Sequence, residues 1–245
     1  MPVTGMSDTG LGSATRRGEP VDMTPDRWNF TRDYLVDVFG AQDEQLRTLM
    51  PRAVAAGLPD IAVSADVGRL LMLLTSMTGG GRGARLALEV GTLAGYSGIW
   101  IARGLAPGGR LITVEAEPRH ADFAEREFVA ANVGSSVEIR RGAALQVLPS
   151  IVGELGAGGF DLVFLDAAKR EYCDYFQSVR AAIAPGGLLV ADNVLGSHTW
   201  WIDEPPGRTA DRDGADRFNR MVAADAEFET VAVPLREGVL MARKR

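Results

Sequence analysis

In this chain of 245 residues, apolar residues recur at helical spacing near the N-terminus and form short continuous runs further along. Between Trp28 and Ala56 they return at helical spacing, which predicts one or two amphipathic helices. A further helix is predicted to begin after Ser64, a favourable N-cap residue, and a Gly-rich connector follows at 78–83. Residues 1–25 are rich in small and polar residues without periodicity, so we expect a disordered tail there.

Beyond residue 84 short apolar runs alternate with helical segments. Runs that are apolar nearly throughout are typical of parallel strands buried on both faces of a sheet. The predicted strands are 85–91, 110–116, 136–142, 160–167 and 187–194, and the predicted helices between them are 97–105, 118–132, 143–155 and 170–183. Two last strands, 228–235 and 238–244, are too close in the chain for a crossover helix, which predicts an antiparallel hairpin.

These elements predict an α/β fold with a doubly wound, mostly parallel sheet of seven strands and a C-terminal antiparallel hairpin. We interpret residues 26–245 as a single domain with a helical extension at about 28–60. The composition, 46% hydrophobic and 24% charged, is ordinary for a soluble globular protein. A net charge of −6 and a pI near 5.1 make a nucleic-acid partner unexpected, because no basic excess exists to displace counterions.

The remaining bulk features point to the cytoplasm. The single cysteine, Cys173, excludes an internal disulfide and suits a reducing compartment. No apolar run approaches the roughly 20 residues that span a bilayer, and the N-terminus lacks a signal-peptide pattern, so no membrane partner is expected. All 26 basic residues except Lys169 and Lys244 are arginine, so a lysine beside a motif is informative.

Acidic residues stand at the carboxyl ends of four predicted strands, where ligands bind in open α/β sheets. Glu89, Glu115 and Asp166 each end one strand, and Asp192 with Asn193 ends the fifth. Each residue alone could simply cap the following helix. If the fourth and fifth strands are neighbours, about 4.8 Å apart, Asp166, Asp192 and Asn193 converge on one ion. Such an all-oxygen set suits Mg²⁺, Mn²⁺ or Ca²⁺ rather than zinc.

The glycine-rich turn after the first strand indicates a nucleotide-like ligand. Gly91, Gly95 and Gly98 do not have the G-x-G-x-x-G spacing, which argues against a nicotinamide-dependent oxidoreductase. At the end of the second strand, the Glu115 carboxylate could accept both hydroxyls of a ribose.

Several motifs together resemble one family. The segments are "SADVG", "LEVGTLAGYS", "VEAE", "GAALQVL", "FLDAAK", "ADNVL" and "VPLREGVLMARK". They resemble the cation-dependent O-methyltransferases that include the caffeoyl-coenzyme A and catechol O-methyltransferases, in their bacterial small-molecule form, over about 28–244. The resemblance implies the class I methyltransferase fold, S-adenosylmethionine (SAM) as methyl donor, and Mg²⁺, Mn²⁺ or Ca²⁺.

The resemblance also implies roles for individual residues. Asp166, Asp192 and Asn193 would bind the metal, and Lys169 would act with Asp166 in catalysis as the general base. The residues implied to contact the methyl donor are Val63, Glu89, Gly91, Thr92, Ser97, Glu115, Ala144 and Asp166.

The chain departs from the family pattern at three places. Ala168 stands where a second acidic residue is usual, and Val63 stands where Thr is usual. "PLREG" replaces the common Pro-Leu-Gly-Asp-Gly, so that Glu237 takes the place of Asp. None of these changes affects the three implied metal ligands.

The acceptor side is less defined. The long irregular segment after the fifth strand, up to a helix that begins near Asp211, carries Ser197, His198, Trp200 and Trp201. These could line an aromatic pocket, although both tryptophans could equally serve packing or dimer contacts. We expect His120 on the surface.

The sequence therefore predicts a SAM- and divalent-metal-dependent O-methyltransferase for a small molecule with vicinal hydroxyls, possible in natural-product tailoring. A tRNA hydroxyuridine O-methyltransferase and a non-catalytic donor-binding protein are the alternatives. The resemblance implies a homodimer, which the helices between 28 and 56 permit.

Overall fold

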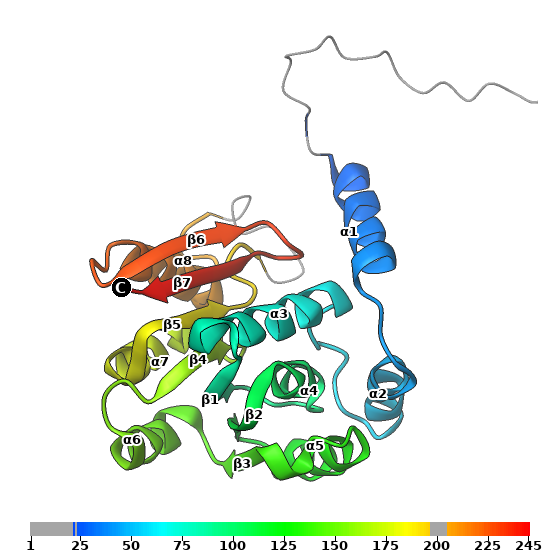
Figure 1. Ribbon diagram of the computed structural model, residues 1–245. Helices are drawn as coiled ribbons and strands as arrows, with labels where there is room; N and C mark the ends of the chain where they lie inside the picture. The colour runs from blue at the N-terminus through cyan, green and yellow to red at the C-terminus, as the bar shows by residue number, and fades with distance from the viewer. Residues whose placement is uncertain (1–21, 23, 197–204) are drawn as a thin grey trace, which may run out of the picture.

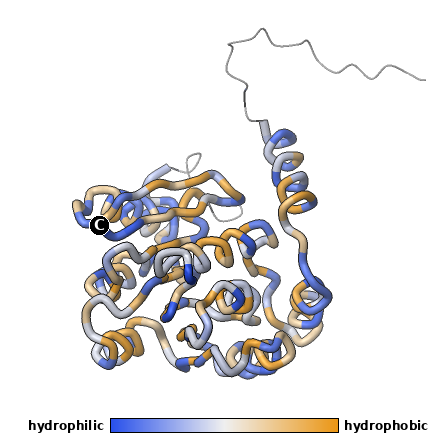
Figure 2. Tube along the Cα trace, in the orientation of Figure 1, coloured by the Kyte–Doolittle hydropathy of each residue, from blue (hydrophilic) through white to orange (hydrophobic). Residues whose placement is uncertain are grey.

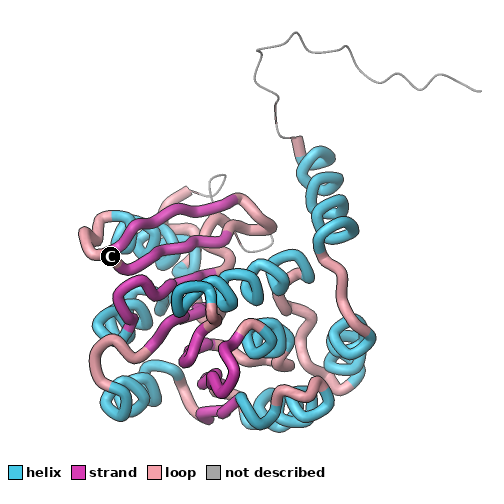
Figure 3. Tube along the Cα trace, viewed as in Figure 1, coloured by secondary structure: helices cyan, strands magenta, loops and turns pink. Residues whose placement is uncertain are grey.

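The computed structural model describes residues 22, 24–196 and 205–245. Almost all of the predicted tail at 1–25 lies outside these residues. The seven strands are β1 (Ala84–Val90), β2 (Leu105–Glu115), β3 (Val137–Arg141), β4 (Phe160–Leu165), β5 (Ile183–Ala191), β6 (Phe228–Val233) and β7 (Val239–Lys244). They form one sheet in the order β3-β2-β1-β4-β5-β7-β6. All pairs from β3 to β5 are parallel, and β7 is antiparallel to both β5 and β6, so the predicted fold class is confirmed (Figures 1 and 3).

Helices cover both faces of this sheet. The described α-helices are α1 (Pro25–Phe39), α2 (Glu44–Ala55), α3 (Ala65–Gly81), α4 (Tyr96–Arg103), α5 (Pro118–Ala130), α6 (Ala144–Leu155), α7 (Tyr172–Val179) and α8 (Ala210–Ala223). One layer of core joins the sheet to α2, α3, α4 and α5, and the other joins it to α6, α7 and α8. None of the described helices is long and apolar enough to cross a membrane.

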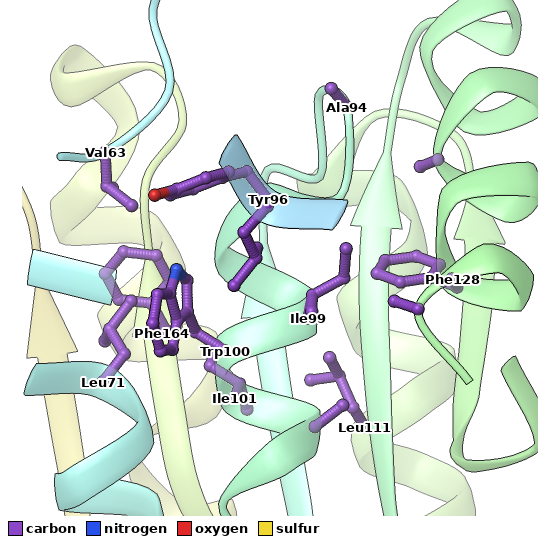
Figure 4. Packing of buried hydrophobic residues seen from close by; sticks show 14 of the residues in the cluster. Val63, Leu71, Ala94, Tyr96, Ile99, Trp100, Ile101, Leu111, Phe128 and Phe164 are labelled. Atoms are coloured by element: carbon purple, nitrogen blue, oxygen red, sulfur yellow. The ribbon is translucent and has the colours of Figure 1, made fainter. Parts of the chain in front are cut away.

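Each central strand contributes side chains to both layers of core, because successive side chains of a strand point to opposite faces of the sheet. In β4, Leu162 and Phe164 pack into the first layer, and Val163 and Leu165 pack into the second. Figure 4 shows the first layer, where Phe164 lies near Trp100 of α4. Uniform apolarity in the sequence therefore reflects burial on both faces, as the pattern predicted.

The predicted boundaries of two strands and one helix are wrong. β2 and β5 begin several residues before the predicted strands, at Leu105 and Ile183, and each contains a Pro-Gly-Gly segment. The strand register shifts there, so that an apparent turn signal is a bulge inside a strand. The predicted helix 170–183 is shorter, because its ends are the 3₁₀ turns η2 (Lys169–Glu171) and η3 (Arg180–Ala182) around α7.

The predicted helices at the N-terminal end differ in how they pack. Leu46, Leu49 and Ala53 of α2 are buried against the body of the protein. In contrast, α1 has no buried residue and stands away from the body, with apolar side chains exposed along it (Figures 1 and 2).

Candidate active site

A cavity of about 410 Å³ opens at the carboxyl ends of the parallel strands. Eight of the residues predicted for the site line it: Val63, Gly91, Thr92, Ser97, Glu115, Asp166, Lys169 and Asn193. Of the other predicted residues, Glu89 and Asp192 are fully buried behind this lining, and Ala144 begins α6 without lining the cavity. Ser197, His198, Trp200 and Trp201 lie outside the described residues.

The strand ends approach one another closely through their backbones. The N–H of Asp166 donates to the carbonyl of Val90 at 2.9 Å, and the N–H of Asp192 donates to that of Leu165 at 3.1 Å. Gly91 has φ +100°, and a Cβ there would lie 2.2 Å from the carbonyl oxygen of Asp166. Glycine is required here because a side chain would push the two loops apart.

Glu89 is the centre of a buried hydrogen-bond network. Its Oε1 accepts from the hydroxyl of Ser97 and its Oε2 from that of Thr113, both at 2.6 Å. Since Thr113 donates to Glu89, the hydroxyl of Thr92, 2.6 Å from that of Thr113, is the donor in the next bond. Burial raises the pKa of Glu89 to about 8, although the hydroxyls of Ser97 and Thr113 lower it.

Glu115 holds the glycine-rich turn. Its Oε2 accepts from the backbone N–H groups of Thr92 at 3.1 Å and Leu93 at 2.8 Å, and its Oε1 accepts from that of Glu117 at 2.9 Å. A carboxylate has about four lone-pair sites, so capacity for a further donor remains. The expectation of a surface position for His120 is wrong: its ring lines the cavity, and Nδ1 lies 3.5 Å from Oε1 of Glu115.

Asp166 and Lys169 form a shielded ion pair. Asp166 follows β4 directly, and Lys169 begins η2, which brings Nζ within 2.6 Å of Oδ1 of Asp166. Burial lowers the pKa of Lys169, but the carboxylate of Asp166, together with Tyr172 and Asp192, raises it well above its ordinary value. The lysine is therefore an ammonium in the metal-free protein, although a general base must be neutral.

Asp192 and Asn193 contact side chains of the turn that precedes β7. Leu165 pairs with Ala191, so Asp166 and Asp192 leave neighbouring strands side by side, as the predicted convergence requires. Arg236 Nη1 lies 3.0 Å from Oδ2 of Asp192, and Asn193 donates through Nδ2 to Glu237 at 3.3 Å. Sequence reasoning missed Arg236, because only the antiparallel pairing of β7 with β5 brings its turn to this edge.

The residues present fit a divalent cation. Oδ1 of Asp192 is buried and has no hydrogen-bond partner, and burial and the Asp166 carboxylate raise the pKa of Asp192 to about 7 although Arg236 and Lys169 lower it. A buried carboxylate oxygen without a donor is a position where a cation is favoured. Across the described ranges no three His, Cys, Asp or Glu side chains are grouped to hold a metal ion, so a cation here would also need the amide oxygen of Asn193 beside the two carboxylates.

Comparisons with known proteins agree with this fold and site. A family model for O-methyltransferases matches residues 37–245. A catechol O-methyltransferase of Niastella koreensis is 41% identical over 202 residues, which are 82% of this chain and 88% of that protein. An O-methyltransferase of Bacillus cereus, solved in complex with SAH, is 33% identical with a TM-score of 0.79, over 90% of this chain and 99% of that one. TomG of Streptomyces achromogenes, solved with SAM and involved in tomaymycin synthesis, is 34% identical with a TM-score of 0.78, over 91% and 99%.

The chain therefore belongs to the O-methyltransferase family. It is a class I, SAM-dependent O-methyltransferase of the caffeoyl-coenzyme A and catechol type, as its motifs predicted. Its cavity lies where this fold class places ligands, outside the carboxyl ends of the parallel strands.

Glu89 is expected to make stability depend on pH. Folding raises the pKa of Glu89 from 4.5 to about 8, so the folded chain holds a proton there that the unfolded chain has lost. The free energy of unfolding therefore falls as the pH rises through this window. We expect urea unfolding to show that Glu89→Gln gains stability relative to the wild type across that range, with the exposed Glu117→Gln as matched control. Parallel pH curves for wild type and Glu89→Gln would contradict this expectation.

Proposed function

We propose that this enzyme requires a divalent cation and methylates one hydroxyl of a small aromatic molecule that carries two vicinal hydroxyls. The observation that carries the proposal is the pair of carboxylates, Asp166 and Asp192, at adjacent strand ends, with Oδ1 of Asp192 buried and without a hydrogen-bond partner. The Niastella relative, named a catechol O-methyltransferase, supports the same acceptor class.

Asp166, Asp192 and Asn193 would hold the cation. A phenol ionises near pH 10, like tyrosine, so it is a poor nucleophile at neutral pH. A bound divalent cation would lower the pKa of a coordinated hydroxyl and fix its direction of attack. The hard oxygen ligands suit Mg²⁺, Mn²⁺ or Ca²⁺.

Lys169 is proposed to accept the proton of the acceptor hydroxyl. Its ammonium lies in the cavity wall beside Asp166, which supports this role. The role also requires the neutral amine, which is not the form that Lys169 has in the metal-free protein. The Asp166 carboxylate is the largest influence that raises its pKa. When Asp166 is shared with a divalent cation and the cavity holds a sulfonium, both positive charges favour the neutral amine.

We assign the donor to the half of the cavity formed by β1, β2 and their loops. Thr92 and Ser97 line this half, and Glu115 fixes its turn. Glu89, whose pKa burial raises to about 8, would supply a buried negative charge when a nearby cationic ligand lowers that pKa. Val63 and Gly91 line this half as well, and Asp166 borders it. Ala144, which the resemblance also implies as a donor contact, begins α6 and does not line the cavity. Val63 can contribute only packing or backbone contacts there.

A role in natural-product tailoring is proposed for the pathway context. The likeness to TomG, which is involved in tomaymycin synthesis, supports it. The net charge of −6 disfavours an RNA acceptor.

We also propose a homodimer formed through α1. Phe30, Tyr34 and Val38 lie four residues apart and share one face of α1, with exposed fractions of 72%, 52% and 48%. An apolar stripe on a helix that stands away from its own body favours burial against another surface, and a second copy presents the same stripe.

Removal of metal should abolish methyl transfer. Wild-type protein treated with chelator is expected to lose turnover of catechol with labelled SAM, and Mg²⁺ or Mn²⁺ should restore it, while binding of SAH, followed by calorimetry, changes little. Phenol and guaiacol, which lack the vicinal diol, serve as control acceptors. Undiminished turnover after elemental analysis confirms metal removal would overturn the metal requirement.

Lys169→Met should separate proton transfer from positioning. The variant keeps the aliphatic stem and removes the proton acceptor, so kcat on catechol should fall by about 10²- to 10⁴-fold with SAH affinity little changed. The loss should be smaller for nitrocatechol, whose hydroxyl is already ionised. Arg170→Met, at an exposed neighbouring position, is the matched control. A Lys169→Met enzyme within about threefold of wild type on catechol would refute the role.

The dimer is checked by light scattering at micromolar concentration. The wild type should show twice the 26.2 kDa chain mass, and Tyr34→Asp should shift it toward the monomer because a charge would be buried in the apolar stripe. Asn29→Asp, an exposed polar position on α1, is the control. A wild-type monomer would exclude the proposal.

A further inference from the structure

Arg236 occupies an unusual backbone position beside the proposed metal ligands. It lies in the turn 235–238 with φ +51°, a conformation that a long side chain rarely adopts. The turn is held against the end of β5, because the N–H of Val194 donates to Gly238 at 3.0 Å and the N–H of Leu195 donates to Glu237 at 2.8 Å. The backbone thus fixes the base of the Arg236 side chain next to Asn193.

The guanidinium lies between two carboxylates. Nη1 is 3.0 Å from Oδ2 of Asp192, and Nε is 2.9 Å from Oε2 of Glu237. The Arg236 side chain is 17% exposed and that of Asp192 is fully buried, so solvent screens the Arg236–Asp192 pair only weakly. The Arg236 head group nevertheless lines the cavity, which gives it space to move.

We propose that Arg236 is a built-in counter-cation that competes with the divalent metal ion for Asp192 and so weakens metal binding. The inference rests on the proposed metal dependence of the enzyme. Oδ1 of Asp192 has no hydrogen-bond partner, whereas the guanidinium already holds the other oxygen of the same carboxylate. A metal ion at Oδ1 and the Arg236 guanidinium at Oδ2 would therefore be two positive charges on the same carboxylate, which repel each other. Either the guanidinium moves away when the ion binds, or the ion binds less tightly.

The local charge balance leads to the same conclusion. Three carboxylates, of Asp166, Asp192 and Glu237, face two protein cations, Lys169 and Arg236, so the group carries one net negative charge when all three carboxylates are ionised. Without Arg236 it would carry two, which would neutralise a divalent ion.

The same arrangement stabilises the metal-free protein. Asp192 is buried, and without Arg236 its charge would lack its closest partner. Removal of the guanidinium should thus have two opposite effects: lower stability without metal and tighter binding of metal. A guanidinium that only supports the turn would affect the stability and leave the metal affinity unchanged.

The test measures Mn²⁺ affinity directly, through the electron paramagnetic resonance signal of free Mn²⁺, at fixed ionic strength and without donor or acceptor. Arg236→Gln should bind Mn²⁺ roughly tenfold more tightly than wild type, because one nearby positive charge is removed. Arg236→Lys, which keeps the charge, should stay nearer to wild type. Arg110→Gln removes one positive charge in the middle of β2, at a residue that does not line the cavity, and should leave the affinity within about twofold.

Thermal unfolding supplies the second readout. Arg236→Gln should melt below wild type without metal and gain more from added Mn²⁺. If this variant does not fold, Arg236→Gly replaces it, because glycine accepts the left-handed backbone. Asp192→Asn should abolish Mn²⁺ binding in either background, which ties the signal to this site.

The outcomes separate the two proposals. Equal Mn²⁺ affinity in wild type, Arg236→Gln and Arg236→Gly would overturn the competition and leave metal dependence standing. Failure of wild type and both charge-removing variants to bind Mn²⁺ would refute the metal site itself, and the competition with it. Weaker binding in Arg236→Gln would show that the guanidinium assists the ion, which also contradicts the inference.

Discussion

The parallel pairing of β4 with β5 is the constraint on which the rest of the site depends. Leu165 lies opposite Ala191, so the next residues, Asp166 and Asp192, leave adjacent strands at the same level. Two carboxylates in that arrangement repel each other and favour protonation of one, unless positive charge compensates them. Lys169 and Arg236 provide that compensation from two different segments of the chain, before and after β5.

The helix layer beneath the sheet maintains this geometry. The hydroxyl of Tyr172 in α7 lies 3.0 Å from the carbonyl of Leu165 and 3.1 Å from that of Asp192, so one side chain contacts the ends of both strands. Its ring packs edge-on against Phe218 of α8, and Nζ of Lys169 lies 5.3 Å from its centroid. Packing in the second layer of core is thereby linked to the spacing of the two carboxylates.

The two halves of the cavity satisfy their buried carboxylates in different ways. Glu89 and Glu115 accept hydrogen bonds from hydroxyls and backbone N–H groups. Asp166 and Asp192 are ion-paired instead. The first half is suited to a cationic donor, and the second presents charges that can be exchanged for those of a metal ion.

The amino-acid sequence by itself determined the fold class and eight of the residues that line the cavity. Apolar runs of strand length and a closing hairpin are local patterns, and Glu115, Asp166 and Asn193 were identifiable because strand ends of a parallel sheet share one edge. Bulges remained hidden, since Pro-Gly-Gly inside β2 and β5 has the composition of a turn. Only the tertiary structure decided that Arg236 reaches Asp192 and that His120 faces the cavity. Arg236 and Asp192 are 44 residues apart in the chain and meet only through the pairing of β7 with β5. The position of His120 depends on how α5 docks against the sheet, which no local pattern encodes.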